Sequence, residues 1–272
     1  MDYGIANIRG KPTRKDVFGI FDLAWEMGVR HFDTAPGYGS ENLLGEFIIA
    51  NGLQDEAIIL TKIPSLTNST DHKHSIKTSL ESSLGNLGCP INVLFFHDST
   101  DSGLLLNEPQ FFENLLCDYP LSRMGVSVYE TQEIEKLSGS HFELAFQFPY
   151  NVLDRRFEHV DIPKGMRYAR SVFLQGILAS NNDLRLDTSN ELRNLQKIYH
   201  DRLEKYNVEP VVFAMSFVAN NDVVDYFLIG VDTVSQLHDI LNQQLNYHQF
   251  KSIFDSFNLR IDKDWLDPRT WN

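Results

Sequence analysis

Four side chains that could take part in a proton transfer lie at, or close to, the ends of short apolar runs. Asp33, Lys62 and His97 each end one of these runs, and Tyr38 follows five residues after Asp33 in a loop flanked by glycines. In parallel barrels, functional side chains lie at the carboxyl ends of buried strands. We therefore predict that these four residues form one site.

The four residue types suit the donation of a proton to a carbonyl oxygen. A tyrosine is a weak acid, with an ordinary pKa of about 10. A nearby lysine ammonium favours the phenolate and lowers that pKa, so Lys62 would activate Tyr38 while Asp33 holds the ammonium in place. His97 would orient the substrate carbonyl by a hydrogen bond. Such a site protonates the carbonyl oxygen while hydride arrives at the carbon.

Each of these residues also has an explanation that needs no catalysis. Asp33 could cap a helix, Tyr38 could be an ordinary loop aromatic, and His97 could be a core histidine bonded to the backbone. Lys62 is harder to explain in this way, because a lysine after Ile-Ile-Leu-Thr would be desolvated and would need a partner. Together the four residues favour catalysis over four separate structural roles.

Strand and helix patterns alternate along almost the whole chain. The expected strands cover residues 31–33, 58–62, 93–97, 123–128, 142–148, 169–174 and 226–230. The expected helices cover residues 13–28, 43–50, 74–87, 110–116, 130–137, 191–206 and 210–218, with two more beginning at residue 234 and near residue 250. This alternation, without a linker, predicts an α/β fold and a single domain over residues 1–272.

The positions of the polar residues favour one kind of α/β fold. Polar side chains end several successive strands, whereas an open doubly wound sheet would gather its ligand at one switch point. We therefore predict a closed parallel barrel of the TIM-barrel type.

Composition narrows the setting and the partners of the chain. Its 272 residues and 42% hydrophobic content suit one barrel with a sizeable core. No apolar stretch is long enough for a membrane span, and no secretory signal is visible, so we expect a cytoplasmic protein. Two cysteines give no disulfide framework. A net charge of −13 argues against nucleic acid and anionic membranes as partners, leaving a small-molecule substrate and a possible homo-oligomer. No metal site is expected.

Several segments resemble the aldo-keto reductase superfamily. Residues 28–35, Tyr38–Glu41 and Leu44–Gly45 look like the first hallmark of that family, and its later segments are similar to Gly125–Ser127, Gln147–Asn151 and Leu174–Gly176. The likeness covers most of the chain and is strongest to a bacterial branch. It implies an eight-stranded barrel with a catalytic tetrad of Asp33, Tyr38, Lys62 and His97. It also implies a nicotinamide dinucleotide, NADP(H) or NAD(H), bound without a Rossmann domain, and the chain has no G-x-G-x-x-G motif.

The resemblance also implies where the cofactor binds. Ser127 and Gln147 would bind the nicotinamide carboxamide. The strand end at Arg170 and Ser171 would supply the face against which the ring stacks. The loop that holds the adenosine phosphate, and the helix beyond it, would contribute Gly230, Val231, Asp232, Gln236 and Asp239.

Three departures from the family pattern lead to further expectations. Val128 stands where many members have an asparagine, which removes one amide contact to the cofactor. Asp232 stands in a loop where NADPH-preferring members often carry a base, so we expect no strong preference for NADPH. Residues 1–8 are too short and too polar to form a normal first strand. We therefore expect an incomplete or irregular barrel between the strands ending at Asp33 and Gly230, and weak cofactor binding.

These observations favour an NAD(P)-dependent reduction of an aldehyde, ketone or keto-sugar to an alcohol, with Tyr38 as the general acid. Two alternatives stay open. One is a non-catalytic, cofactor-sensing or regulatory barrel of the same family, and the other is an aldolase that forms a Schiff base on Lys62. The residues of the chain do not name the substrate.

Overall fold

The computed structural model describes residues 5, 7, 10–179, 184–245, 247–257 and 261–271. Its contacts divide the chain into two compact units. The first unit comprises Arg14–Gln147 and Val160–Met166, and the second comprises Met1–Thr13, Phe148–His159 and Arg167–Asn272. The single domain expected over residues 1–272 stays a prediction.

Parallel strands alternating with helices build the first unit. Its strands are β1 (His31–Asp33), β2 (Ile58–Ile63), β3 (Ile91–Phe96), β4 (Leu121–Ser127) and the start of β5 (Ala145–Pro149). Each strand pairs in parallel with the next, with Asp33 opposite Leu60, Lys62 opposite Phe95, and Ser127 opposite Gln147. Because the pairing is parallel throughout, the carboxyl ends of these strands lie along one edge.

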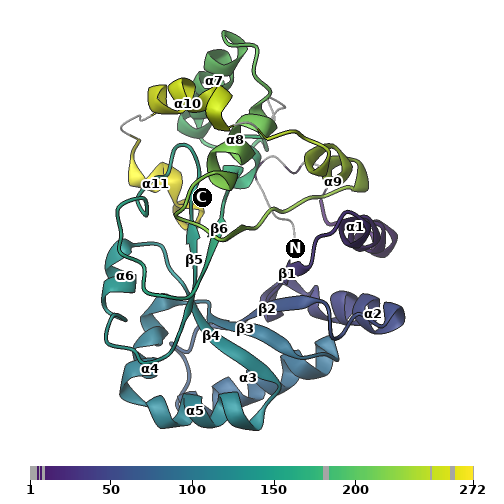
Figure 1. The fold of residues 1–272 in the computed structure, drawn as a ribbon, viewed down its shortest axis with the longest axis vertical. Coiled ribbons are helices and arrows are strands. Elements are labelled where there is room, and N and C mark those ends of the chain that lie inside the picture. The colour runs from purple at the N-terminus through teal and green to yellow at the C-terminus, as the bar shows by residue number, and fades with distance from the viewer. Residues whose placement is uncertain are drawn as a thin grey trace. The chain divides into compact units, whose positions relative to one another are not determined.

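Helices cover these strands. They are α1 (Arg14–Glu26), α2 (Glu41–Asn51), α3 (His72–Leu87), α4 (Leu104–Asn107), α5 (Pro109–Asp118) and α6 (Thr131–Glu135), with short 3-10 helices η1 (Pro36–Tyr38) and η2 (Ser99–Gly103). Figure 1 shows α3 and α5 along one side of β2, β3 and β4. Ile59, Leu60, Phe95 and Phe96 are fully buried. The apolar strands therefore form a rigid base for the polar residues at their ends.

Helix ends follow from local sequence. The Asp71 side chain accepts a hydrogen bond from the His74 backbone at the start of α3, and Gly88 ends that helix with a φ of 63°. Gly52 ends α2 in the same way, with a φ of 67°. Carboxylates suit helix N-caps, and glycine adopts the left-handed conformation without a Cβ penalty.

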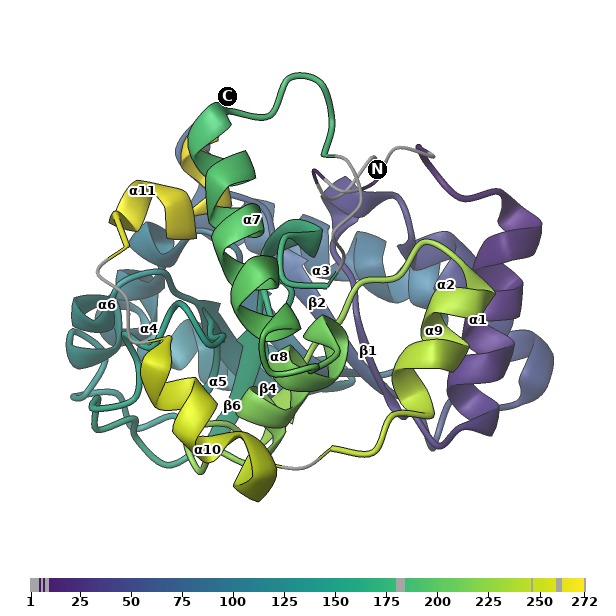
Figure 2. The ribbon, with the colours of Figure 1, turned by 90° about the horizontal axis from the view of Figure 1, so that it is seen from above.

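The second unit is mostly helical. It holds the end of β5, most of β6 (Met166–Arg170), β7 (Tyr226–Phe227), η3 (Leu174–Gly176), α7 (Asn190–Glu204), α8 (Pro210–Ala219), α9 (Val234–Leu241), α10 (Tyr247–Ser256), α11 (Lys263–Leu266) and η4 (Pro268–Thr270). β6 and β7 pair in parallel, with Tyr168 opposite Tyr226. Helices α8 and α10 lie side by side (Figure 2). They pack through aromatic rings, and the ring centroids of Phe213 and Phe254 are 4.6 Å apart.

Two of the expected strands are displaced or shortened. The strand expected over residues 169–174 is wrong in its position, because β6 ends at Arg170. Ser171, Leu174 and Gln175 have φ angles of 59°, 44° and 53°, which no strand allows. Their apolar neighbours Val172 and Phe173 lie in a loop and are nevertheless buried. The hydrophobic pattern of this segment is therefore the same as that of a buried strand. The strand expected over residues 226–230 is shorter, since β7 ends at Phe227.

The expectation for the start of the chain falls mostly outside the described residues. Of residues 1–8, only Ile5 and Asn7 are described, and neither lies in a strand. The first strand among the described residues is β1, which is three residues long. None of the described helices is both long and apolar enough to cross a membrane.

Candidate active site

A buried ion pair connects the ends of β1 and β2. The Lys62 ammonium donates to Asp33 Oδ1 and Oδ2 at 2.8 and 2.7 Å, and to the Thr34 carbonyl oxygen at 2.9 Å. Lys62 is 1% exposed. A buried ammonium is tolerated only when its charge and its N–H groups are satisfied, and these three acceptors match its three donors. Lys62 is therefore held in one place at the strand end.

Tyr38 and His97 lie next to this pair. The Lys62 Nζ atom is 5.1 Å from the centroid of the Tyr38 ring. The rings of Tyr38 and His97 meet edge to face, with centroids 6.3 Å apart. His97 directly follows β3, and its backbone N–H donates to the Ile63 carbonyl at 3.1 Å. The structure thus brings together all four residues that the sequence predicted to form one site.

The loop that carries Tyr38 has a defined local fold. Pro36 begins η1, the Tyr38 N–H donates to the Ala35 carbonyl at 3.0 Å, and Gly39 ends the turn with a φ of 67°. The hydroxyl oxygens of Thr34 and Ser40 are 2.7 Å apart across the loop. The turn therefore fixes the backbone from which the Tyr38 ring projects.

Ser127 ends β4, and Gln147 is the middle residue of β5. They face each other in the β4–β5 register and are 3% and 2% exposed. The Gln147 side-chain amide donates to Asp33 Oδ1 at 2.9 Å. Gln147 was expected to bind a cofactor carboxamide, and its contact with Asp33 was not foreseen. The amide of Gln147 thus lies beside the ion pair, and Ser127 is its partner in the strand register.

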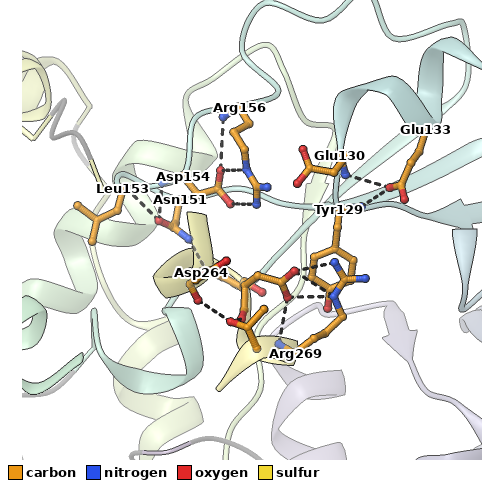
Figure 3. Close-up of polar contacts among 12 residues, drawn as sticks. Tyr129, Glu130, Glu133, Asn151, Leu153, Asp154, Arg156, Asp264 and Arg269 are labelled. Carbon is orange, nitrogen blue, oxygen red and sulfur yellow. Dashed lines mark hydrogen bonds and ion pairs between the residues drawn. The ribbon is translucent and has the colours of Figure 1, made fainter. Parts of the chain in front are cut away.

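Hydrogen bonds join successive loops of the first unit. The Leu66 N–H donates to Asp101 Oδ2 at 2.8 Å, and burial raises the pKa of the Asp101 carboxyl. The Ser99 hydroxyl donates to Glu133. As Figure 3 shows, Glu133 also accepts from the backbone N–H groups of Tyr129 and Glu130, at 2.7 and 2.9 Å. Glu133 therefore fixes the segment that follows Ser127, although no role was predicted for it from sequence.

In the second unit, Arg170 ends β6 and Ser171 opens the turn with positive φ angles. The Asn151 side-chain amide donates to the Ser171 carbonyl at 3.0 Å. Figure 3 shows the Asn151 oxygen accepting from the backbones of Leu153 and Asp154. Asn151 belongs to a segment that resembles the aldo-keto reductases, but no function was predicted for it from sequence. Its complete burial beside a strained turn suggests that it holds Ser171 in place.

The residues expected to hold the adenosine phosphate lie along one loop and helix of the second unit. Gly230 and Val231 precede Asp232, whose carboxylate accepts from the Asn7 side chain at 3.0 Å. The Asp232 backbone N–H donates to the Gln236 side chain at 2.8 Å. Asp239 is on α9 with its side chain 71% exposed. No lysine or arginine occurs between residues 230 and 239.

The sequence relationships agree with this arrangement. The model of the aldo/keto reductase family matches residues 1–254, and the chain belongs to that family. It is 32% identical over 133 residues to a norsolorinic acid reductase of Emericella nidulans. The aligned region covers 43% of this chain and 34% of that protein. It is 29% identical over 132 residues to an uncharacterized oxidoreductase of Schizosaccharomyces pombe, covering 46% and 45%.

The chain therefore spans less than half the length of these two curated relatives. A pyridoxal 4-dehydrogenase of Microbacterium luteolum matches more of the chain, with 24% identity over 284 residues, 83% of this chain and 82% of that protein. These relatives are named as a reductase, an oxidoreductase and a dehydrogenase, respectively.

A solved structure supports the fold class. The holo form of an aldo-keto reductase from Bacillus halodurans matches with a TM-score of 0.74 and 18% identity, over 96% of this chain and 92% of that one. The predicted class, a (β/α)8 barrel with an irregular start, is confirmed by this match. Among the described residues, no group of three histidine, cysteine or acidic side chains could hold a metal ion.

Proposed function

We propose that this protein reduces a carbonyl group of a small molecule to an alcohol, using a nicotinamide dinucleotide. Family membership supports carbonyl reduction in general terms. The observation that carries the proposal is the Lys62 ammonium, which is fixed by Asp33 and lies 5.1 Å from the centre of the Tyr38 ring. A phenol beside a fixed positive charge is suited to give up its proton.

Each tetrad residue then has a defined task. Tyr38 donates its phenolic proton to the carbonyl oxygen, and Lys62 stabilises the phenolate that remains. Asp33 keeps the ammonium charged and in position, and His97 donates a hydrogen bond that orients the carbonyl. When bound, the dinucleotide supplies the hydride to the carbonyl carbon. One hydride and one proton together convert the carbonyl to the alcohol.

The chain's own residues suit such a cofactor. The hydroxyl of Ser127 and the amide of Gln147 are of the types that pair with a carboxamide, and they are adjacent in the strand register. We assign the remaining contacts, in the second unit, to Arg170, Ser171, Gly230, Val231, Asp232, Gln236 and Asp239. Asp232 would repel a 2′-phosphate and could accept from a free ribose hydroxyl, so we expect no strong preference for NADPH.

The geometry disfavours the Schiff-base alternative. A lysine attacks a carbonyl only through its neutral amine, which needs a free lone pair. Lys62 instead directs its N–H groups to three oxygen acceptors, two of them on a carboxylate. That environment stabilises the protonated ammonium. Lys62 therefore supports an acid in this proposal and does not form a covalent bond with the substrate.

Spectroscopic assays with the intact protein test the proposed activity. NADPH and NADH oxidation is followed against a panel of aldehydes, ketones and keto-sugars, and cofactor binding is titrated by fluorescence. Cofactor oxidation that depends on the carbonyl supports the proposal. Tight cofactor binding with no turnover of any carbonyl would instead favour the non-catalytic, cofactor-sensing alternative.

A further inference from the structure

A second buried carboxylate lies at the other end of the Tyr38 loop. Glu41 occupies the first turn of α2 and is 3% exposed. One of its oxygens accepts from the Thr61 hydroxyl at 2.7 Å, and the other accepts from the Asn86 side chain at 3.2 Å. Burying a carboxylate is costly unless hydrogen bonds replace its water. These two donors therefore fix Glu41 in a specific position.

A glycine makes this contact possible. Gly45 lies one helical turn after Glu41 on the same face of α2. A Cβ atom at Gly45 would lie 2.3 Å from the Asn86 carbonyl oxygen and 2.8 Å from the Leu87 Cα atom. Only a residue without a side chain allows α3 to approach this closely. That approach brings the Asn86 amide within reach of Glu41.

Successive residues of β2 hold the two ends of the Tyr38 loop. Lys62 binds the beginning of the loop through Asp33 and the Thr34 carbonyl. Thr61 binds its end through Glu41. Neighbouring side chains on a strand point to opposite faces, so Lys62 and Thr61 bind the two ends of the loop on opposite faces of β2.

We propose that Glu41, through Thr61 and Asn86, is a positioning residue that keeps Tyr38 against Lys62. We call these three residues the Glu41 clamp. The role of the clamp in catalysis rests on the function proposed above, but its effect on Tyr38 is a property of the fold. Without the clamp, the carboxyl end of the loop is free to move away from β2, and the Tyr38 ring moves with it.

Two pairs of variants test the clamp. Thr61→Val removes the hydroxyl and keeps the shape, whereas Thr61→Ser keeps the hydroxyl. We expect Thr61→Val to lower kcat by about 10- to 100-fold, the effect of a small misplacement of a catalytic group. KM for the carbonyl and Kd for the cofactor should stay near their wild-type values, and Thr61→Ser should restore most of kcat. Glu41→Met should match Thr61→Val, and the double variant should be no worse than either single one.

Two control variants separate positioning from loss of stability. Ser83→Ala removes a buried hydroxyl of α3 whose oxygen has no hydrogen-bond partner among the described residues. Leu80→Val lowers stability within the same helix without touching the clamp. Both should keep the wild-type kcat. If Leu80→Val lowers kcat as much as Thr61→Val at an equal loss of Tm, the clamp has only a structural role and the proposal is wrong.

A readout independent of turnover follows the Tyr38 phenol directly. The ultraviolet absorbance of tyrosinate is titrated with pH, and the titration of Tyr38→Phe is subtracted to isolate Tyr38. In Thr61→Val the Tyr38 phenol should ionise at higher pH than in the wild type, because it lies farther from the ammonium. If the Tyr38 phenol titrates at the same pH in Thr61→Val as in the wild type, the clamp does not position Tyr38 and the proposal is wrong. If the wild type reduces no carbonyl, the proposed function fails, and the titration still decides whether the clamp positions Tyr38.

Discussion

At the scale of single residues, Lys62 determines what its neighbours can do. Its ammonium is buried, and it is bound to Asp33 and to the Thr34 carbonyl. A charge fixed in this way cannot turn toward solvent, so it acts on the Tyr38 phenol, which lies beside it. The acidity of the Tyr38 phenol thus depends on one desolvated lysine.

Removing the phenolic proton should stop carbonyl reduction and leave the fold intact. Tyr38→Phe keeps the ring that contacts His97 and Lys62 but deletes the hydroxyl. General acid catalysis contributes about 10²–10⁴-fold, so we expect kcat to fall by that factor. The cofactor Kd and the Tm should change little, as measured by fluorescence titration and thermal melting. A variant that retains most of the wild-type rate would show that Tyr38 is not the acid.

Asp232 should set the balance between the two dinucleotides. We expect the wild type to bind NADPH less than about 100-fold more tightly than NADH, since no base lies between residues 230 and 239. Asp232→Arg should shift the ratio toward NADPH by about tenfold, through a charge-assisted bond to the 2′-phosphate. Asp255→Arg makes the same change of charge on α10 and serves as the control. An equal shift in that control would assign the effect to net charge.

The identity of the candidate catalytic residues could be predicted from sequence, but the contacts between their side chains could not. Asp33, Lys62 and His97 stand out because a polar residue after an apolar run is unusual. The amide of Gln147 reaches Asp33 across more than a hundred residues of sequence, and such a contact depends on the three-dimensional arrangement of β1 and β5. The role of Glu41 was hidden for the same reason, since its partners lie on β2 and α3.

At the scale of elements, the contact between α2 and α3 depends on Gly45. An alanine there would place its Cβ 2.3 Å from the Asn86 carbonyl oxygen. We expect Gly45→Ala to destabilise the protein by about 1–3 kcal/mol, the usual cost of overpacking. Urea unfolding monitored by circular dichroism measures the change.

Gly85 provides the matched control for that substitution. It lies in α3, and a Cβ at this position would meet nothing within 4 Å. Gly85→Ala should therefore stabilise the protein by up to about 1 kcal/mol, because alanine is the better helix former. If both alanine variants had the same effect on stability, close packing at Gly45 would not be the cause.

His31, the first residue of β1, should make stability depend on pH. Burial lowers the pKa of His31 below its ordinary value of 6.5. The unfolded chain therefore binds a proton at a higher pH than the folded chain, so folding is weakened as pH falls below about 6.5. We expect His31→Gln to lose less stability than the wild type between about pH 8 and pH 5.5. Urea midpoints at the two pH values test this, and equal losses in both proteins would contradict it.

Element boundaries were predictable where local signals are strong. The apolar strands β2 and β3 and the helix α3, with its cap at Asp71 and its stop at Gly88, lie close to where the sequence placed them. The turn after Arg170 was missed because its backbone strain is supported by tertiary contacts, such as the Asn151–Ser171 hydrogen bond. Hydrophobicity records that a residue is buried, but it does not record the backbone conformation in which it is buried.

At the scale of the whole molecule, the proposed function needs residues from both units. The tetrad, Ser127 and Gln147 belong to the first unit, and Arg170, Ser171 and the 230–239 segment belong to the second. The cofactor contacts that we assign to each unit form only when that unit is folded. Cofactor affinity thus becomes linked to the folding of the entire chain.

We expect the two units to unfold together, as one domain over residues 1–272. Taken alone, the β6–β7 pair of the second unit would have little stability in water, because isolated two-stranded pairs are marginally stable. Differential scanning calorimetry should therefore show one transition, with equal calorimetric and van't Hoff enthalpies. A dinucleotide at a hundredfold excess over its Kd adds about 2.7 kcal/mol to the folded state, so the whole transition should move to higher temperature. Two transitions, of which only one moves with cofactor, would show that the units fold independently and that one unit alone holds the dinucleotide.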